Sequence, residues 1–206
     1  MGRRRATRQQ GVSTERSVRL RALLSAGMVL GLGAVGTLAA WTDESTATAT
    51  FSAGTLDLKL RTLPDGTLAD SVAMTTLNMT AMYPGVSKAA IVQVSNSGSV
   101  PLSYTLTGSA AAGTGGLGGD LGAALLVGIY SGGTAENTGT AGSCTGTRIG
   151  TADVALISSL IATPQSLAPA GTADLCLVVS LPSNAANNLQ GTSTTASFTF
   201  TASMGS

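Results

Sequence analysis

Short runs of alternating apolar and polar residues make up the chain from Trp41 onward, and glycine, proline and asparagine separate them. Such alternation is typical of β-strands with one buried face. The clearest pair of runs is 88–95 and 102–107, which flank an Asn-Ser-Gly turn. The pattern leaves open whether these two strands pair directly or lie in different sheets.

Further strands are predicted by runs of the same kind at Thr48–Leu60, Ser71–Thr80, Leu125–Tyr130, Thr172–Leu181 and Thr192–Ala202. The segment Asp153–Ile161 fits a short helix or a strand, and its spacing is interpreted as a helix. In the last run Phe198 and Phe200 point to one side, and their burial should weigh heavily because aromatic residues are few. Since each sheet must cover its apolar face, the sequence predicts an all-β, two-sheet β-sandwich.

The N-terminal part has a different pattern. Residues 1–21 are strongly basic, and the apolar core 22–39 that follows carries no charge. A basic region, an apolar core and small residues at the end are the layout of an export signal. We predict a helical signal peptide over 1–39, cleaved between Ala39 and Ala40. A retained transmembrane helix remains an alternative, because the apolar stretch is just long enough to span a bilayer.

Charge is divided between the two parts. The net charge of +1 is the sum of +6 for residues 1–39 and −5 for residues 40–206. A basic N-terminus can bind nucleic acid through phosphates, but the apolar core behind it favours export, so no nucleic-acid partner is expected. We predict that 40–206 is a secreted domain, with signal peptidase as a partner during export. Membrane contact is expected only through an uncleaved leader.

The chain contains no histidine. This excludes a Ser-His-Asp triad, a Cys-His pair and an HExxH zinc site. Gly31, Gly33 and Gly36 match a dinucleotide-binding spacing, but no strand precedes them as that motif requires. The acidic residues of the exported part form no obvious cluster. The sequence therefore predicts a protein that is not an enzyme and that has no catalytic residues, no metal site and no cofactor.

Two cysteines, Cys144 and Cys176, both lie in the predicted exported part. An even number of cysteines in an oxidising compartment predicts one disulfide within the chain. Linkage between two chains and a pair of buried thiols are the alternatives.

Two motifs carry a resemblance to a known family. The segments Gly36–Asp43 (GTLAAWTD) and Ala49–Leu58 (ATFSAGTLDL) resemble the head of the TasA/camelysin family. The likeness continues through VSNSGSVPLSYTLT to the terminal NLQGTSTTASFTFTA and spans most of residues 22–203. The head is fairly specific, whereas the strand motifs occur in many β-sandwiches. The resemblance implies export through a SipW-type signal peptidase of Gram-positive bacteria and a jelly-roll-like sandwich.

The resemblance also implies a structural role at the cell surface or in the biofilm matrix. TasA-like members form extracellular fibres in which the N-terminal strand of one subunit completes the sheet of the next. The corresponding assembly arm here is Ala40–Thr50 with the adjoining Phe51, and Trp41, Asp43 and Phe51 are its candidate residues. The partner is then a second copy or another matrix or surface protein. A disordered tail is the alternative for this segment.

Two other functions compete with the structural one. The first is a monomeric module that binds cell-wall glycan or a partner protein without self-assembly. The second is a metalloprotease, as described for camelysin, but the absence of histidine separates this chain from any histidine-based zinc site.

Overall fold

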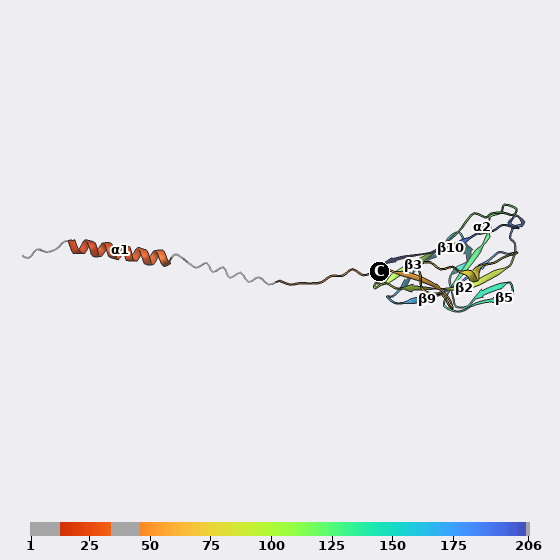
Figure 1. The fold of residues 1–206 in the computed structure, drawn as a ribbon, viewed down its shortest axis with the longest axis horizontal. Coiled ribbons are helices and arrows are strands. Elements are labelled where there is room, and N and C mark those ends of the chain that lie inside the picture. Colours follow the sequence, from red (N-terminus) through yellow and green to blue (C-terminus); the bar gives the residue numbers. More distant parts are fainter. Residues whose placement is uncertain (1–12, 34–45, 205–206) are drawn as a thin grey trace, which may run out of the picture. The chain divides into compact units, whose positions relative to one another are not determined.

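The computed structural model describes residues 13–33 and 46–204 (Figure 1). The chain divides into two units: one ends at Thr50, and the other is the compact unit Phe51–Ser206, which contains every strand. Each unit is described by itself below.

The first unit contains one helix, α1 (Ser13–Gly33). The helix begins inside the predicted basic region and continues into the predicted apolar core, and its described side chains are exposed. None of the helices in the described ranges is long and apolar enough to cross a membrane. The predicted cleavage site at Ala39 and Ala40 lies outside the described residues, so the signal peptide stays a prediction.

The compact unit is built from antiparallel sheets, which confirms the all-β prediction. The larger sheet has the strand order β1-β2-β9-β4-β7, with bounds Leu58–Thr62, Ser87–Asn96, Thr172–Ser180, Leu126–Ser131 and Thr147–Ala155 in that order. The smaller sheet has the order β10-β3-β8, with bounds Ala196–Met204, Leu102–Ala110 and Ser159–Leu167. A hairpin of β5 (Ala135–Thr138) and β6 (Ala141–Cys144) and the short helices α2 (Leu121–Ala124), η1 (Thr75–Leu77) and η2 (Asn187–Leu189) complete the unit.

Side chains of both sheets meet in one apolar core. The larger sheet contributes alternate residues of β2 and β9, and the smaller sheet contributes alternate residues of β3. The fully buried members include Val92, Val94, Leu102, Leu106 and Leu177. In β3 burial follows the period-two alternation that predicted the strand, whereas β2 and β9 also bury residues of their other face, such as Ala89 and Cys176.

The runs 88–95 and 102–107 do not pair with each other. They form parts of β2 and β3, which belong to different sheets, so the Asn-Ser-Gly turn carries the chain from one sheet to the other. Hydrogen bonds of the Asn96 side chain fix the backbone where the chain passes from the larger to the smaller sheet. Its amide nitrogen donates to the carbonyl oxygens of Val100 and Leu167, and its oxygen accepts from the Gly98 amide.

The predicted helix at Asp153–Ile161 is wrong. The segment contains the end of β7, a turn at residues 156–158 and the start of β8. The turn is closed by bonds to Ser158: its hydroxyl donates to the Ala155 carbonyl and its amide donates to the Leu156 carbonyl. Leu156 in the turn and Leu160 and Ile161 in β8 enter the core, and their spacing imitates that of one helical face.

The predicted strand at Ser71–Thr80 is also absent. Residues 70–82, called the strap below, contain only the single turn η1. The strap follows an isolated pairing between Leu60 and Ala69, which closes the outer edge of β1. Because Ala69 already pairs with the edge of β1 at Leu60, the strap does not add a strand to the sheet. Its alternating apolar side chains pack against the core instead.

Candidate functional site

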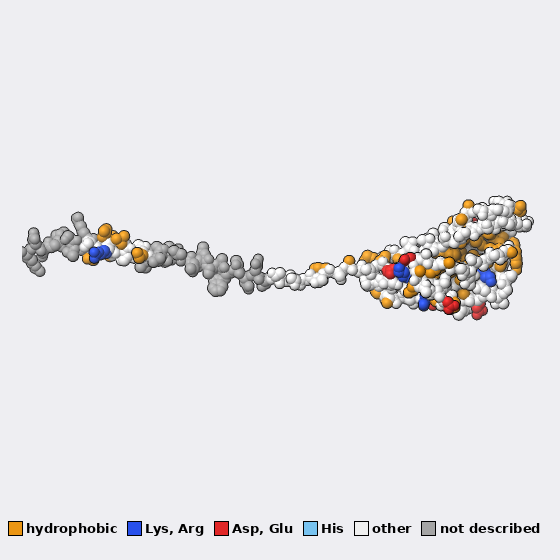
Figure 2. Space-filling view, in the orientation of Figure 1, with side chains coloured by type: hydrophobic (Ala, Val, Ile, Leu, Met, Phe, Trp, Pro, Cys, Tyr) orange, Lys and Arg blue, Asp and Glu red, His pale blue; other side chains and the backbone are white. Residues whose placement is uncertain are grey.

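An open groove of about 1360 Å³ lies between strand β10 and the strap. Residues 189–195 line it as well, and so do residues of the larger sheet such as Leu58, Val92 and Val179. Figure 2 shows hydrophobic side chains in the hollow at the broad end of the compact unit. Clefts of this kind, apolar and concave, are the usual places where proteins hold ligands or partner segments. The groove is therefore the candidate functional site.

The inner face of β10 forms one wall of the groove. Phe198, Phe200 and Ala202 point to this side and pack against the core while remaining half-buried. The Phe200 ring centroid lies 6.2 Å from that of Tyr104, which is only 2% exposed. The two phenylalanines thus share one face as predicted, but they are covered on one side only, and the rest of their surface faces the groove.

The outer edge of β10 is unprotected. Among the described strands β10 pairs with β3 alone, and no backbone hydrogen bond between described residues reaches its other edge. Natural edge strands usually carry charges, prolines or bulges that prevent pairing with another chain. The nine residues Ala196–Met204 contain neither a charge nor a proline. This edge therefore has the properties of a strand that accepts a partner.

The candidate assembly arm is described from residue 46 onward. Trp41 and Asp43 lie outside the described residues, so their role stays a prediction. Phe51 is 91% exposed, and no hydrogen bond within the described part of the chain involves residues 46–53. Within the compact unit, the first hydrogen bonds of the described chain are made by Thr55. Its amide donates to the Ser99 hydroxyl over 2.9 Å, and its carbonyl accepts from the Ser99 amide.

The described part of the arm has a strand pattern without a strand. Ala47, Ala49 and Phe51 alternate with threonines, yet the segment pairs with no described residue. The sequence TATATFSA resembles TASFTFTA of β10 in having small and aromatic residues on one face and hydroxyls on the other. The signal that the sequence carries for the arm is therefore an amphipathic strand pattern in a segment that forms no strand in the described structure.

An ion pair fixes the start of the strap. The Lys59 ammonium on β1 lies 2.6 Å from the Asp70 carboxylate and 3.4 Å from that of Asp57. The hydrogen bond to Asp70 is the main reason why the pKa of Lys59 is raised, with a smaller contribution from Asp57. Because the pair is exposed, it positions the strap more than it stabilises the fold.

Tyr104 gives the compact unit a dependence on alkaline pH. Burial raises the pKa of its phenol above the ordinary value of 10.0. The folded state therefore holds its proton more tightly than the unfolded state, and this contribution is complete below pH 10 and is lost as pH rises through the folded pKa.

We expect the unfolding free energy of wild type to fall by up to about 1.4 kcal/mol per pH unit above pH 10 through this residue alone. Tyr104→Phe should flatten the alkaline decline, because it removes this phenol. Urea unfolding at pH 8 and pH 11 measures the difference. Equal declines for wild type and Tyr104→Phe would contradict this assignment.

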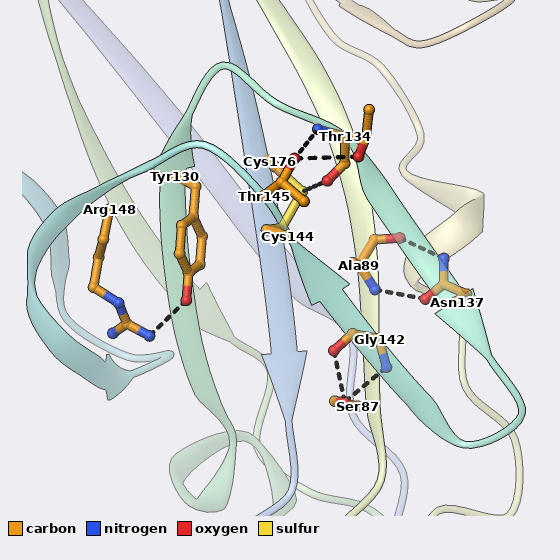
Figure 3. The surroundings of a disulfide bond; sticks show 10 residues. All are labelled: Ser87, Ala89, Tyr130, Thr134, Asn137, Gly142, Cys144, Thr145, Arg148 and Cys176. Carbon is orange, nitrogen blue, oxygen red and sulfur yellow. Dashed lines mark hydrogen bonds between the residues drawn. A yellow bond between two sulfur atoms is a disulfide. The ribbon is translucent and has the colours of Figure 1, made fainter.

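The predicted disulfide between Cys144 and Cys176 is confirmed (Figure 3). It joins β6 to the outer face of β9, so interchain linkage and free thiols are both wrong for these cysteines. Hydrogen bonds also attach the hairpin to β2, one of them from the Ser87 amide to the Thr140 carbonyl. The Asn137 amide exchanges two hydrogen bonds of 2.8 Å with the backbone of Ala89. The Ser87 hydroxyl bonds both the amide and the carbonyl of Gly142.

Clusters of metal-ligating side chains are not found in the described ranges. No group of three or more histidine, cysteine, aspartate or glutamate side chains there could hold a metal ion. Arg148 bonds the Tyr130 hydroxyl over 2.7 Å and the Asp153 carboxylate over 2.8 Å, an arrangement that fixes β7 against β4. The raised pKa of Arg148 follows mainly from the bond to Tyr130. These charged groups serve the fold.

Comparison of the chain with protein-family models and with curated proteins gives no match. The groove, the β10 edge and the arm are therefore the features from which a function is inferred. The shared face of the two phenylalanines was predicted from the sequence, and the arm stays a prediction. The groove and the strap were not predicted, since both depend on how distant segments are placed.

Proposed function

We propose that this chain is a secreted structural protein of the cell surface or extracellular matrix, which assembles by strand addition at β10. In this proposal the two sheets are the layers of a jelly-roll-like β-sandwich, and the chain is a relative of the TasA/camelysin proteins. The observation that carries the proposal is the uncharged, unpaired edge of β10 beside an apolar groove.

The arm of a second copy is the proposed partner. A strand added at β10 places alternate side chains in the groove and leaves the others in solvent. Ala47, Ala49 and Phe51 supply small and aromatic groups for the groove, and the intervening threonines remain outside. No hydrogen bond in the described part of the chain involves these residues, which fits a segment that pairs with a neighbour.

The proposed location is supported by the disulfide. A bond between cysteines persists in oxidising compartments and is rare in the cytosol, and this one joins two elements of the compact unit. Export in the proposal uses the predicted signal over residues 1–39, with the arm released at Ala40. No enzymatic activity is proposed, and a monomeric binding module is the outcome if assembly fails.

Assembly is tested with residues 40–206 and three variants. Wild type is expected to form concentration-dependent oligomers or fibres in sedimentation and electron microscopy. Phe51→Asp replaces the aromatic anchor with a charge and should raise the concentration needed for assembly at least about 100-fold. Deletion of residues 40–51 should leave a monomer. Thr50→Asp is the matched control, because it places the same charge on the opposite face of the arm.

The proposal fails on either of two results. One is a wild type that stays monomeric at high concentration over a range of pH and salt. The other is a deletion variant that assembles as well as wild type, since the arm would then be unnecessary.

A further inference from the structure

The strap is attached to the rest of the compact unit in an unusual way. Its ends are fixed by the pairing of Ala69 with Leu60 and by the bond from the Gly85 amide to the Leu181 carbonyl. Between them the backbone hydrogen bonds are both local, from Leu77 to Met74 and from Asn78 to Thr75. Within the described part of the chain, no backbone hydrogen bond joins residues 70–82 to another element.

Side chains alone therefore hold the strap against the core. Five apolar residues make this contact, and all are half-buried: Val72, Met74, Leu77, Met79 and Met82. Three of the five are methionines, whose flexible, unbranched side chains adapt to different surroundings. A segment with few buried contacts and no ladder bonds opens at a lower free-energy cost than a core strand.

The backbone near the C-terminal end of the strap is strained. Ala81 has φ of 52°, in the left-handed region that residues with a Cβ rarely adopt. Gly85, three residues after Met82, has φ of 92° and follows Pro84. Movement of the strap would release Ala81 from this conformation, and the glycine beyond it can absorb the change in direction.

We propose that the strap is a movable wall of the groove, which shifts away from β10 when a strand of another copy pairs with that edge. This inference rests on the proposed function, because it names what regulates the same site. In a free subunit the strap lines the groove together with Phe198 and Phe200 of β10. Assembly then includes the cost of opening the strap, which limits pairing at low protein concentration.

The test uses the assembly-deficient Phe51→Asp form of residues 40–206 and a labelled peptide of residues 40–53. The receptor has an empty groove, and the peptide supplies an intact arm without a methionine. Binding is followed by fluorescence anisotropy. Peroxide oxidation of each methionine, measured by mass spectrometry, then reports on the strap at zero and saturating peptide. Free N-acetylmethionine added to the same reaction is the reference, because Met204 is the last residue of β10 itself.

A displaced strap and a fixed wall give opposite results. If the strap is displaced, saturating peptide should speed the oxidation of Met79 and Met82 several-fold relative to free N-acetylmethionine. If the strap is a fixed wall, the peptide covers these side chains and their oxidation slows or stays the same, which would overturn the inference while the proposed function stands.

A second measurement is the change in peptide affinity that a substitution in the strap causes. Leu77→Ala weakens the contact of the strap with the core, so the open form becomes more populated and the peptide should bind about fivefold more tightly. Thr76→Ala, at an exposed neighbour, should bind as the parent does. Weaker binding by Leu77→Ala would identify the residue as part of a fixed wall. A peptide that binds neither form would overturn the proposed function and the strap together.

Discussion

Replacing Cys144 and Cys176 with alanine should lower the unfolding free energy by about 3–4 kcal/mol. The disulfide closes a loop of 32 residues, and in the chain-entropy account it stabilises the fold by restricting the unfolded chain. A second contribution is local: Cys176 is 1% exposed, so its removal also loosens the packing beneath the β5–β6 hairpin. A loss of this size is a large part of the stability of an ordinary domain.

Denaturant unfolding of wild type and the double-alanine variant, both without reductant, measures this loss. Wild type with reductant should unfold close to the variant, and reductant should leave the variant unchanged. Alanine is preferred to serine, because serine at position 176 would bury a hydroxyl. A difference below about 1 kcal/mol would mean that the hydrogen bonds of Asn137 and Ser87 suffice to hold the hairpin.

Asn96→Ala should be at least as damaging, with an expected loss of about 3–5 kcal/mol. The side chain is 0% exposed and lies at the end of β2, where the chain leaves the larger sheet. It donates to the carbonyls of Val100 and Leu167 over 2.9 and 3.1 Å and accepts from the Gly98 amide over 3.0 Å. Alanine would leave three backbone groups of two different segments without these partners, and buried groups cannot all recover them from water.

Asn137→Ala is the matched control for this prediction. Asn137 also makes two hydrogen bonds to backbone, but it is exposed, so water can replace them and the expected loss is about 1 kcal/mol. Chemical unfolding of the two variants gives the comparison. Similar losses at both positions would show that burial of Asn96 adds nothing to its hydrogen bonds.

The strands that could be predicted from the sequence are those whose alternation matches their burial. Leu102, Tyr104 and Leu106 share one face in the sequence and one core in the structure. The disulfide was predictable too, because the number of cysteines and the inferred compartment required no knowledge of the fold. Local patterns sufficed in these cases, since the decisive interactions repeat along one segment.

The errors arose where a distant segment decides the outcome. The strap alternates as a strand does, but a strand also needs a free edge, and Ala69 already occupies that of β1 at Leu60. At 153–161, the position of a turn at Ser158 divides what resembles one helical face into two strands. The groove could not be predicted at all, because its lining combines the strap, the C-terminal segment that ends in β10, and residues of β1, β2 and β9, which are far apart in the chain.

The disulfide also determines how copies of this protein can be joined. The chain has two cysteines, and both are consumed in one intramolecular bond, so no thiol remains for a covalent bridge between copies. Any assembly is then held by noncovalent contacts alone. Denaturant without reductant should dissolve it completely, and a nonreducing denaturing gel of the dissolved material should show a single band at the mass of one chain.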